Sequence, residues 1–265
     1  MSGFDKDWLA LREPVDMRAR AMPLVPQLAG ILDKRERPVV LDIGCGTGST
    51  FRSLSKHLPA GVCWHLLDYD PLLLAEAERR IGKRADVTFR QFDLNAIESL
   101  DLSEVNVVTA SALFDLCSAA FCDMFAASLV ASSTGLYAAL NYDGVMEWSI
   151  VHPLDQQVAD DFNRHQHYDK GFGPALGPDA TEHLRQCFGS AGYDIAIASS
   201  PWIMGPEDEA LQVAFLRGLR RPLVEVGLLT ENEIQAWLQF RLDKISESGS
   251  SCVVGHTDIL ALPRF

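Results

Sequence analysis

The chain has 265 residues, 48% of them hydrophobic, which is enough for one large globular domain or a domain with a cap. Its 36 acidic residues outweigh 23 basic ones, so the formal net charge is −13, and the basic residues form no dense patch. This balance disfavours nucleic acid as the substrate, because phosphate backbones are bound through clustered lysine and arginine side chains.

The N-terminal stretch MSGFDKDWLALREP carries charges throughout and has no signal-peptide core, which favours a cytoplasmic protein. The most apolar window, MFAASLVASSTGLYAAL, is interrupted by polar residues and Gly135. We therefore expect a helix and a strand there, and no membrane span. Six cysteines without a CxxC pair are typical of reduced, buried thiols in the same compartment.

Residues 1–37 are expected to form a helical cap segment, since apolar residues repeat at helical spacing over 24–32. Arg12, Asp16 and Arg20 in this segment are spaced i, i+4, i+8. Such spacing is typical of a surface ion-pair ladder. The alternative is that Arg12 or Arg20 folds over the following loop and binds a carboxylate there.

Strands and helices then alternate along the chain. Helices are expected from about residue 49, with Ser49 or Thr50 as the cap, and after Asp70, an N-cap followed by proline, with two more over 118–131 and 180–193. Buried strands are expected over 38–43, 61–68, 87–92, 105–110, 135–142, 194–200 and 251–262. This order predicts an α/β fold with a doubly wound, mostly parallel, seven-stranded sheet that helices cover on both faces.

Residues 206–248 interrupt the alternation, because they separate the last two expected strands and have the pattern of two helices. Connections in compact domains are normally two to six residues long, so this segment is an insertion. It is interpreted as a packing helix pair or a dimer surface, or alternatively as part of a substrate cap. The oligomeric state is open, and a homodimer through the insertion is one alternative.

The stretch VVLDIGCGTGSTFRSL places Gly44, Gly46 and Gly48 at the end of the first strand. Ligands of parallel sheets bind where strands turn into helices, and glycine lets the backbone approach them. The G-x-G-x-G spacing differs from the G-x-G-x-x-G that binds a pyrophosphate. Asp42, just before the turn, would repel a pyrophosphate and attract a cation.

Two more acidic residues stand at strand ends. Asp68 ends the second strand, where a carboxylate can accept hydrogen bonds from both ribose hydroxyls. Asp93 ends the third strand and could accept a hydrogen bond from an adenine amino group. A ligand with a cation, a ribose and an adenine is S-adenosylmethionine.

The segments VLDIGCGTG, LLDYDP, FRQFDL and VVTASALFDL resemble, in order and spacing, the cofactor motifs of class I S-adenosylmethionine-dependent methyltransferases. The resemblance covers residues 38–142 as a cofactor-binding half and implies a single methyltransferase domain over 1–265. It implies that the glycine loop holds the methionine part, Asp68 the ribose and Asp93 the adenine. The expected cofactor-binding residues are Arg20, Asp42, Gly44, Cys45, Gly46, Gly48, Asp68, Tyr69, Asp93, Leu94 and Ser111.

The cofactor dictates the expected chemistry, an in-line transfer of the methyl group to a small-molecule acceptor. Asp115 and His165 are the candidate catalytic residues, because the acceptor should lie over the ends of the fourth and fifth strands. His165 stands in NRHQHYDKGFGPALGP, within a possible substrate loop over 143–180 whose glycines could hinge. Histidine titrates near neutral pH and suits a general base. No metal is expected, since His165 and His167 have no evident third ligand.

Two other functions are compatible with the sequence. One is a non-catalytic S-adenosylmethionine-binding module that acts through a partner, with the insertion as its interface. The other is a nicotinamide-dependent oxidoreductase, which the glycine spacing and Asp42 disfavour.

Overall fold

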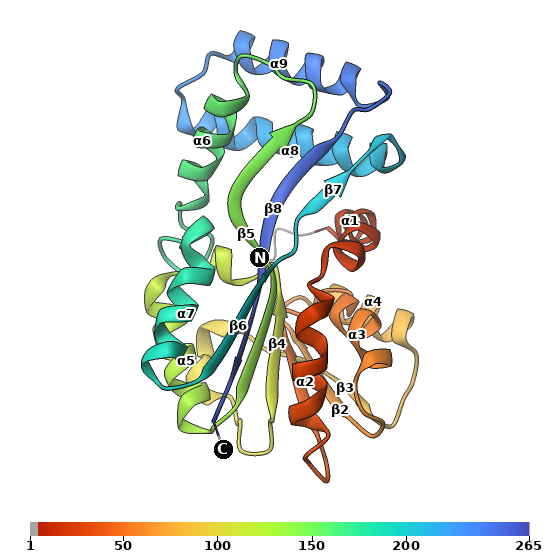
Figure 1. The fold of residues 1–265 in the computed structure, drawn as a ribbon, viewed down its shortest axis with the longest axis vertical. Coiled ribbons are helices and arrows are strands. Elements are labelled where there is room, and N and C mark those ends of the chain that lie inside the picture. The colour runs from red at the N-terminus through yellow and green to blue at the C-terminus, as the bar shows by residue number, and fades with distance from the viewer. Residues whose placement is uncertain (1–4, 265) are drawn as a thin grey trace.

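One mixed sheet runs through the computed structural model, which describes residues 5–264 (Figure 1). The first four residues of the expected segment 1–37 and the last residue of the chain lie outside the described residues. The sheet order is β3-β2-β1-β4-β5-β8-β6, and β7 pairs with β8. The strands are β1 (Val39–Ile43), β2 (Cys63–Asp68), β3 (Val87–Gln91), β4 (Val107–Ser111), β5 (Gly135–Trp148), β6 (Asp194–Ser199), β7 (Trp202–Met204) and β8 (Cys252–Leu262).

The strands from β1 to β5 pair in parallel, and β8 is antiparallel to β5, β6 and β7. The predicted doubly wound, mostly parallel sheet is therefore confirmed. The sheet has one strand more than the seven expected. This strand, β7, has only three residues, too few to give a periodic pattern in the sequence.

Helices cover both faces of the sheet (Figure 1). Alternate residues of β1 supply the two cores, because successive side chains of a strand point to opposite faces. The helices are α1 (Lys6–Ala19), α2 (Val25–Leu32), α3 (Ser49–Leu54), α4 (Pro71–Ile81), α5 (Ala119–Ala131), α6 (Asp155–Gln166), α7 (Ala180–Ser190), α8 (Glu209–Val226) and α9 (Glu231–Lys244). Val40 packs with α2, α3 and α4, whereas Leu41 and Ile43 pack with α5 and α7.

A cap stands at the carboxyl edge of the parallel strands, where β5 and β8 continue beyond their neighbours as an antiparallel ribbon (Figure 1). The ribbon, β7, α6, α8 and α9 share a third apolar core with residues of α1. Arg241 of α9 pairs with Asp155 of α6 and ties two helices of the cap together. Residues 206–248 thus hold α8 and α9, which pack into this cap.

The segment 143–180 is more regular than expected. The fifth strand was expected to end at Tyr142, but β5 continues to Trp148, and α6 then includes His165. Irregular backbone remains mainly over 149–154 and 167–176. The expected substrate loop is corrected accordingly, because α6 carries an apolar side that packs into the cap core through Val158 and Ala159. No helix within residues 5–264 is long and apolar enough to span a bilayer.

Candidate functional site

The glycine turn after β1 is a left-handed bend. Gly44, Gly46 and Gly48 have φ angles of +60°, +53° and +82°, a region that side-chain-bearing residues rarely adopt. The Cys45 N–H donates to the Leu67 carbonyl at 2.9 Å, which anchors the turn to the end of β2. Gly48, and not Ser49 or Thr50 as expected, is the N-cap of α3, because its φ lies outside the range that those residues favour.

Asp68 at the end of β2 organises this turn. Its Oδ2 accepts from the Gly46 N–H at 2.7 Å, and its Oδ1 accepts from the Asp70 N–H at 2.9 Å. Burial raises the pKa of the Asp68 carboxyl above its usual value, although both hydrogen bonds favour its charged form. The carboxylate is thus held in place beside the glycine turn, and its remaining lone pairs can serve a ligand.

Residues beyond β2 and β3 form an open edge of the site. Tyr69 is 51% exposed, and Asp93 is exposed while its Oδ1 accepts from the Asn95 N–H at 2.9 Å. Leu94 is buried beside them in the core. The sequence-predicted residues of β2 and β3 therefore gather at one edge, because these strands are parallel neighbours.

Arg20 and Asp42 lie buried at the glycine turn with unused polar atoms. The Arg20 Nη2 donates to the Ser111 Oγ at 2.9 Å, whereas its Nε and Nη1 have no partner within the described chain. The Asp42 Oδ1 accepts from the Thr109 Oγ1 at 2.7 Å, and its Oδ2 has none within the same residues. Burial raises the pKa of Asp42 to about 7. Buried polar atoms without a partner cost free energy, which a polar ligand would remove.

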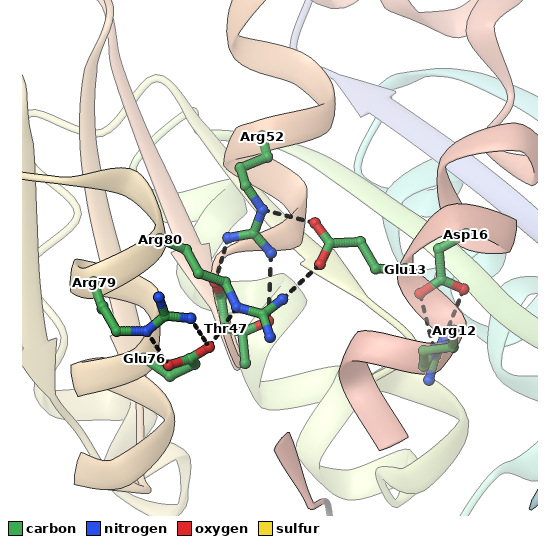
Figure 2. A network of polar contacts seen from close by, with 8 residues as sticks. All are labelled: Arg12, Glu13, Asp16, Thr47, Arg52, Glu76, Arg79 and Arg80. Atoms are coloured by element: carbon green, nitrogen blue, oxygen red, sulfur yellow. Dashed lines mark hydrogen bonds and ion pairs between the residues drawn. The ribbon is translucent and has the colours of Figure 1, made fainter. Parts of the chain in front are cut away.

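Helix α1 covers the turn from above. Leu9, Arg12 and Asp16 of this helix line a small cavity of about 50 Å³ together with the glycine loop and Ser111. Figure 2 shows how the helix is fastened: Glu13 of α1 accepts from Arg52 of α3 at 2.7 Å and from Arg80 of α4 at 3.0 Å. Arg12 and Asp16 form the expected i, i+4 pair at 2.8 Å, but this pair is buried and not on the surface.

A larger cavity of about 440 Å³ opens between the sheet edge and the cap. Aromatic rings line it and contact one another: the Trp202 ring centroid lies 5.0 Å from that of His256 and 6.4 Å from that of Phe215. Tyr142 lies 6.1 Å from His256 on the other side. We call this the ring cavity, and its rings are Trp8, Tyr142, Phe162, Trp202, Phe215 and His256.

The two cavities share a wall. The Arg12 guanidinium lies 5.0 Å from the centre of the Trp202 ring, and Trp202 Nε1 donates to the Asp16 Oδ1 at 2.8 Å. Arg12 and Asp16 line the cavity at the glycine turn, and Trp202 lines the ring cavity. The two spaces are thus neighbours across one layer of side chains.

Asp115 and His256 bring ionisable groups to the ring cavity. Burial raises the pKa of Asp115 to about 6, and its Oδ1 has no partner among residues 5–264. Burial and the charge of Arg12 lower the pKa of His256 to about 3, so this imidazole is neutral. Its Nδ1 lies 3.0 Å from the Val254 carbonyl, which only accepts, so the proton is assigned to Nδ1 and Nε2 keeps a lone pair.

His165 lies outside the lining of the ring cavity, at the last turn of α6. Its Nε2 is 2.7 Å from the Glu225 Oε2, and Lys170 Nζ is 3.0 Å from its Nδ1. Because a carboxylate accepts and an ammonium donates, both ring nitrogens are engaged. The neighbouring residue Gln166 reaches the cavity instead. The role of His165 as a base stays a prediction that this arrangement disfavours.

His256, Trp202 and Phe215 were not among the expected site residues. They come from β8, β7 and α8, which the cap folds over the sheet edge. Single aromatic residues in separate elements give no sequence motif, so only the tertiary arrangement identifies them.

The comparisons with known proteins agree with this geometry. Residues 40–131 match the family model of a methyltransferase domain. A sequence search of curated proteins finds no match. Over these residues the resemblance to class I methyltransferases is confirmed, since the matched segment contains the glycine turn, Asp68, Asp93 and Ser111.

Solved structures with the same fold are distant in sequence. A chain of the Haloferax volcanii complex between the Trm112 methyltransferase activator and a candidate methyltransferase is 15% identical, with a TM-score of 0.51, covering 98% of this chain and 95% of that one. A candidate methyltransferase from Bacillus halodurans is 13% identical, with a TM-score of 0.51 and coverage of 90% and 96%. A S-adenosylmethionine-dependent methyltransferase from Geobacter sulfurreducens in complex with S-adenosylhomocysteine is 17% identical, with a TM-score of 0.49 and coverage of 98% and 99%.

Proposed function

We propose that the protein, whose residues 40–131 match a methyltransferase domain, transfers a methyl group from S-adenosylmethionine to a small-molecule acceptor in the ring cavity. The observation that carries the proposal is that the two cavities adjoin at the end of β4, where Ser111 lines the one at the glycine turn and Asp115 lines the ring cavity. Both reactants would be held at this point, and the side chains of the shared wall would move aside so that the acceptor reaches the methyl group. Holding two reactants in place is the main catalytic device available to such an enzyme.

The residues at the glycine turn fit the cofactor, S-adenosylmethionine. Its methionine part carries a carboxylate and an ammonium group. The unpartnered Nε and Nη1 of Arg20 are donors for a carboxylate, and the unpartnered Oδ2 of Asp42 is an acceptor for an ammonium group. Asp68 would hold the ribose, and the open edge at Tyr69 and Asp93 would receive the adenine.

When bound, the cofactor supplies an electrophilic methyl group on a sulfonium, and in-line displacement by the acceptor is part of the proposal. Asp115 is proposed as the general base, because it is buried, lines the ring cavity and has a raised pKa of about 6. A base works best when its pKa is near the working pH. His256 Nε2 is a second hydrogen-bond acceptor in the same cavity, but its lowered pKa of about 3 makes it too weak a base to take the proton.

Asp68→Asn should weaken S-adenosylhomocysteine binding by about 1.5–3 kcal/mol, the range for hydrogen bonds to a charged group. The amide keeps one acceptor oxygen but no charge for the ribose hydroxyls. Isothermal titration calorimetry measures the affinity. Asp101→Asn is the matched control, since Asp101 only accepts from the Ser103 N–H in an exposed turn. Equal affinities of both variants and wild type would disprove the ribose assignment.

His165→Gln should leave the pH dependence of turnover as it is in the wild type. The reason is that His165 is held by Glu225 and Lys170 outside the lining of the ring cavity. The pH–rate profile, recorded with any acceptor that the wild type methylates, checks this. Loss of a kinetic pKa near neutrality would instead restore His165 as the base.

A further inference from the structure

Asp115 is a buried carboxylate that lacks an ion pair. It is 8% exposed, and its Oδ1 has no hydrogen-bond partner in the part of the chain that the structure describes. Burial raises the pKa of Asp115, and the two cations that oppose this shift, Arg12 and Lys170, have other partners: Arg12 is paired with Asp16 at 2.8 Å, and Lys170 donates to the His165 carbonyl at 3.0 Å. A buried acceptor without a donor is costly, so the cavity is arranged for a ligand that donates.

The rings around Asp115 favour a donor that is positively charged. The faces of tryptophan, tyrosine and phenylalanine rings attract cations, and the effect is strongest where water is excluded. The protein already uses Trp202 in this way, since the Arg12 guanidinium lies 5.0 Å from its ring centre. The rings of Tyr142, Phe162 and Phe215 have no such cation among residues 5–264 and line the cavity.

The imidazole of His256 is neutral in the cavity and therefore does not repel a cation. Its neighbours are the rings of Trp202 and Tyr142, with centroids at 5.0 and 6.1 Å. Its Nδ1 donates to the Val254 carbonyl, so the lone pair on Nε2 can accept a second hydrogen bond. The cavity thus offers two acceptors, one of them charged, between aromatic walls.

We infer that the methyl acceptor is an amine that enters as its ammonium ion, carries a flat apolar group, and binds with its nitrogen toward Asp115. This inference rests on the proposed function and names its substrate class. The apolar group would lie against the rings, which supply half of the residues that line the cavity. A neutral alcohol or phenol of the same size would satisfy only the hydrogen bonds and would leave the charge of Asp115 uncompensated.

The reaction balances for an amine. The ammonium first gives a proton to Asp115, from which it passes to solvent. The freed nitrogen lone pair then forms the bond to the methyl carbon as the carbon–sulfur bond breaks, and the electrons of that bond stay on sulfur. An ammonium and a sulfonium cation enter; a methylated ammonium, a neutral sulfide and one proton leave.

Binding to the full chain, saturated with S-adenosylhomocysteine, tests the inference without requiring turnover. The probes are 2-phenylethylamine, the matched alcohol 2-phenylethanol, and benzyltrimethylammonium, which cannot be methylated. We expect both cations to bind more tightly than the alcohol by calorimetry: the amine at least tenfold, and the quaternary ion, which offers its charge but no N–H, by a smaller factor. Asp115→Asn should remove this preference while the alcohol still binds. Asp123→Asn, a matched change at an exposed residue of α5, should keep this preference.

The inference would be overturned if the wild type bound the alcohol as tightly as the amine, or more tightly. It would also be overturned if neither cation bound at millimolar concentration. A preference that survives in Asp115→Asn would overturn it too. Phe215→Leu provides a second variant, and should weaken both cations more than the alcohol. If S-adenosylhomocysteine binds but the probes show no cation preference, only the substrate class is wrong. If a folded protein fails to bind S-adenosylhomocysteine, the proposed function itself is wrong.

Discussion

Gly46→Val is expected to lower the affinity for S-adenosylhomocysteine at least 100-fold, to the point where calorimetry detects no binding. A Cβ at this position would lie 3.2 Å from Leu9 Cδ1, in the lining of the small cavity beneath α1. Valine also resists the φ of +53°, and a shift of this backbone would move the N–H that Asp68 accepts at 2.7 Å. The substitution would therefore both fill the small cavity and break the hydrogen bond from the turn to Asp68.

The control for this variant is Gly61→Val. Gly61 has a φ of +84°, so it bears similar backbone strain, but nothing lies within 4 Å of a Cβ there. It stands in the turn before β2, away from the lining of the small cavity. Circular dichroism would report whether both variants keep the fold. Normal cofactor affinity in a folded Gly46→Val protein would mean that the glycine turn is only a tight bend.

Asp115→Asn is expected to lower turnover by about 10²–10⁴-fold, the usual contribution of a general base. The same change should stabilise the protein, because it removes a buried charge that has no ion pair. A substitution that damages catalysis and strengthens the fold distinguishes an active-site carboxylate from a structural one. Formation of S-adenosylhomocysteine with any acceptor that the wild type methylates measures turnover, and thermal unfolding measures stability.

The stabilising effect should depend on pH in a definite direction. Burial raises the pKa of Asp115 to about 6 in the folded protein, against about 3.9 in an unfolded chain. Between these values the folded protein binds more protons, so its free energy of unfolding falls as the pH rises. The cost of the charge reaches up to about 3 kcal/mol above pH 6.

The melting temperature of Asp115→Asn should therefore exceed that of the wild type most at pH 8, and the difference should shrink toward pH 4. A constant difference across this range would mean that Asp115 titrates normally in the folded protein. Asp160→Asn serves as the control here, because this exposed carboxylate accepts from Gln156 and has no cationic partner among residues 5–264.

The sheet and the cofactor edge could be predicted from the sequence because local patterns determine them. The apolar run into Gly44 specifies a buried strand and a left-handed turn, and Asp70 with Pro71 specifies a helix start, which the structure has. Parallel strands bring their carboxyl ends to one edge, so Asp68 and Asp93 could be assigned to the same edge from their order alone.

The acceptor side could not be predicted in this way. Glycine and proline near His165 indicated a mobile loop, but the apolar side of α6 packs into the cap and orders this residue. Tyr142 was expected near a strand end, yet β5 runs on because β8 pairs with it as far as Trp148. Contacts between segments that are far apart in the chain decide such details, and no local pattern records them.

The position of α1 implies that the two ends of the cofactor are exchanged at different speeds. The edge at Tyr69 and Asp93 is open to water, so the adenosine end can arrive by simple diffusion. The space under Leu9 and Arg12, about 50 Å³, has room for only a few water molecules, so on the proposed placement the methionine end would enter only when α1 lifts. Glu13 holds α1 in place through Arg52 and Arg80, and because these pairs are partly buried, salt weakens them less than it weakens surface pairs. The strength of these two ion pairs would thus set how fast the product leaves and, where product release limits the cycle, the turnover number.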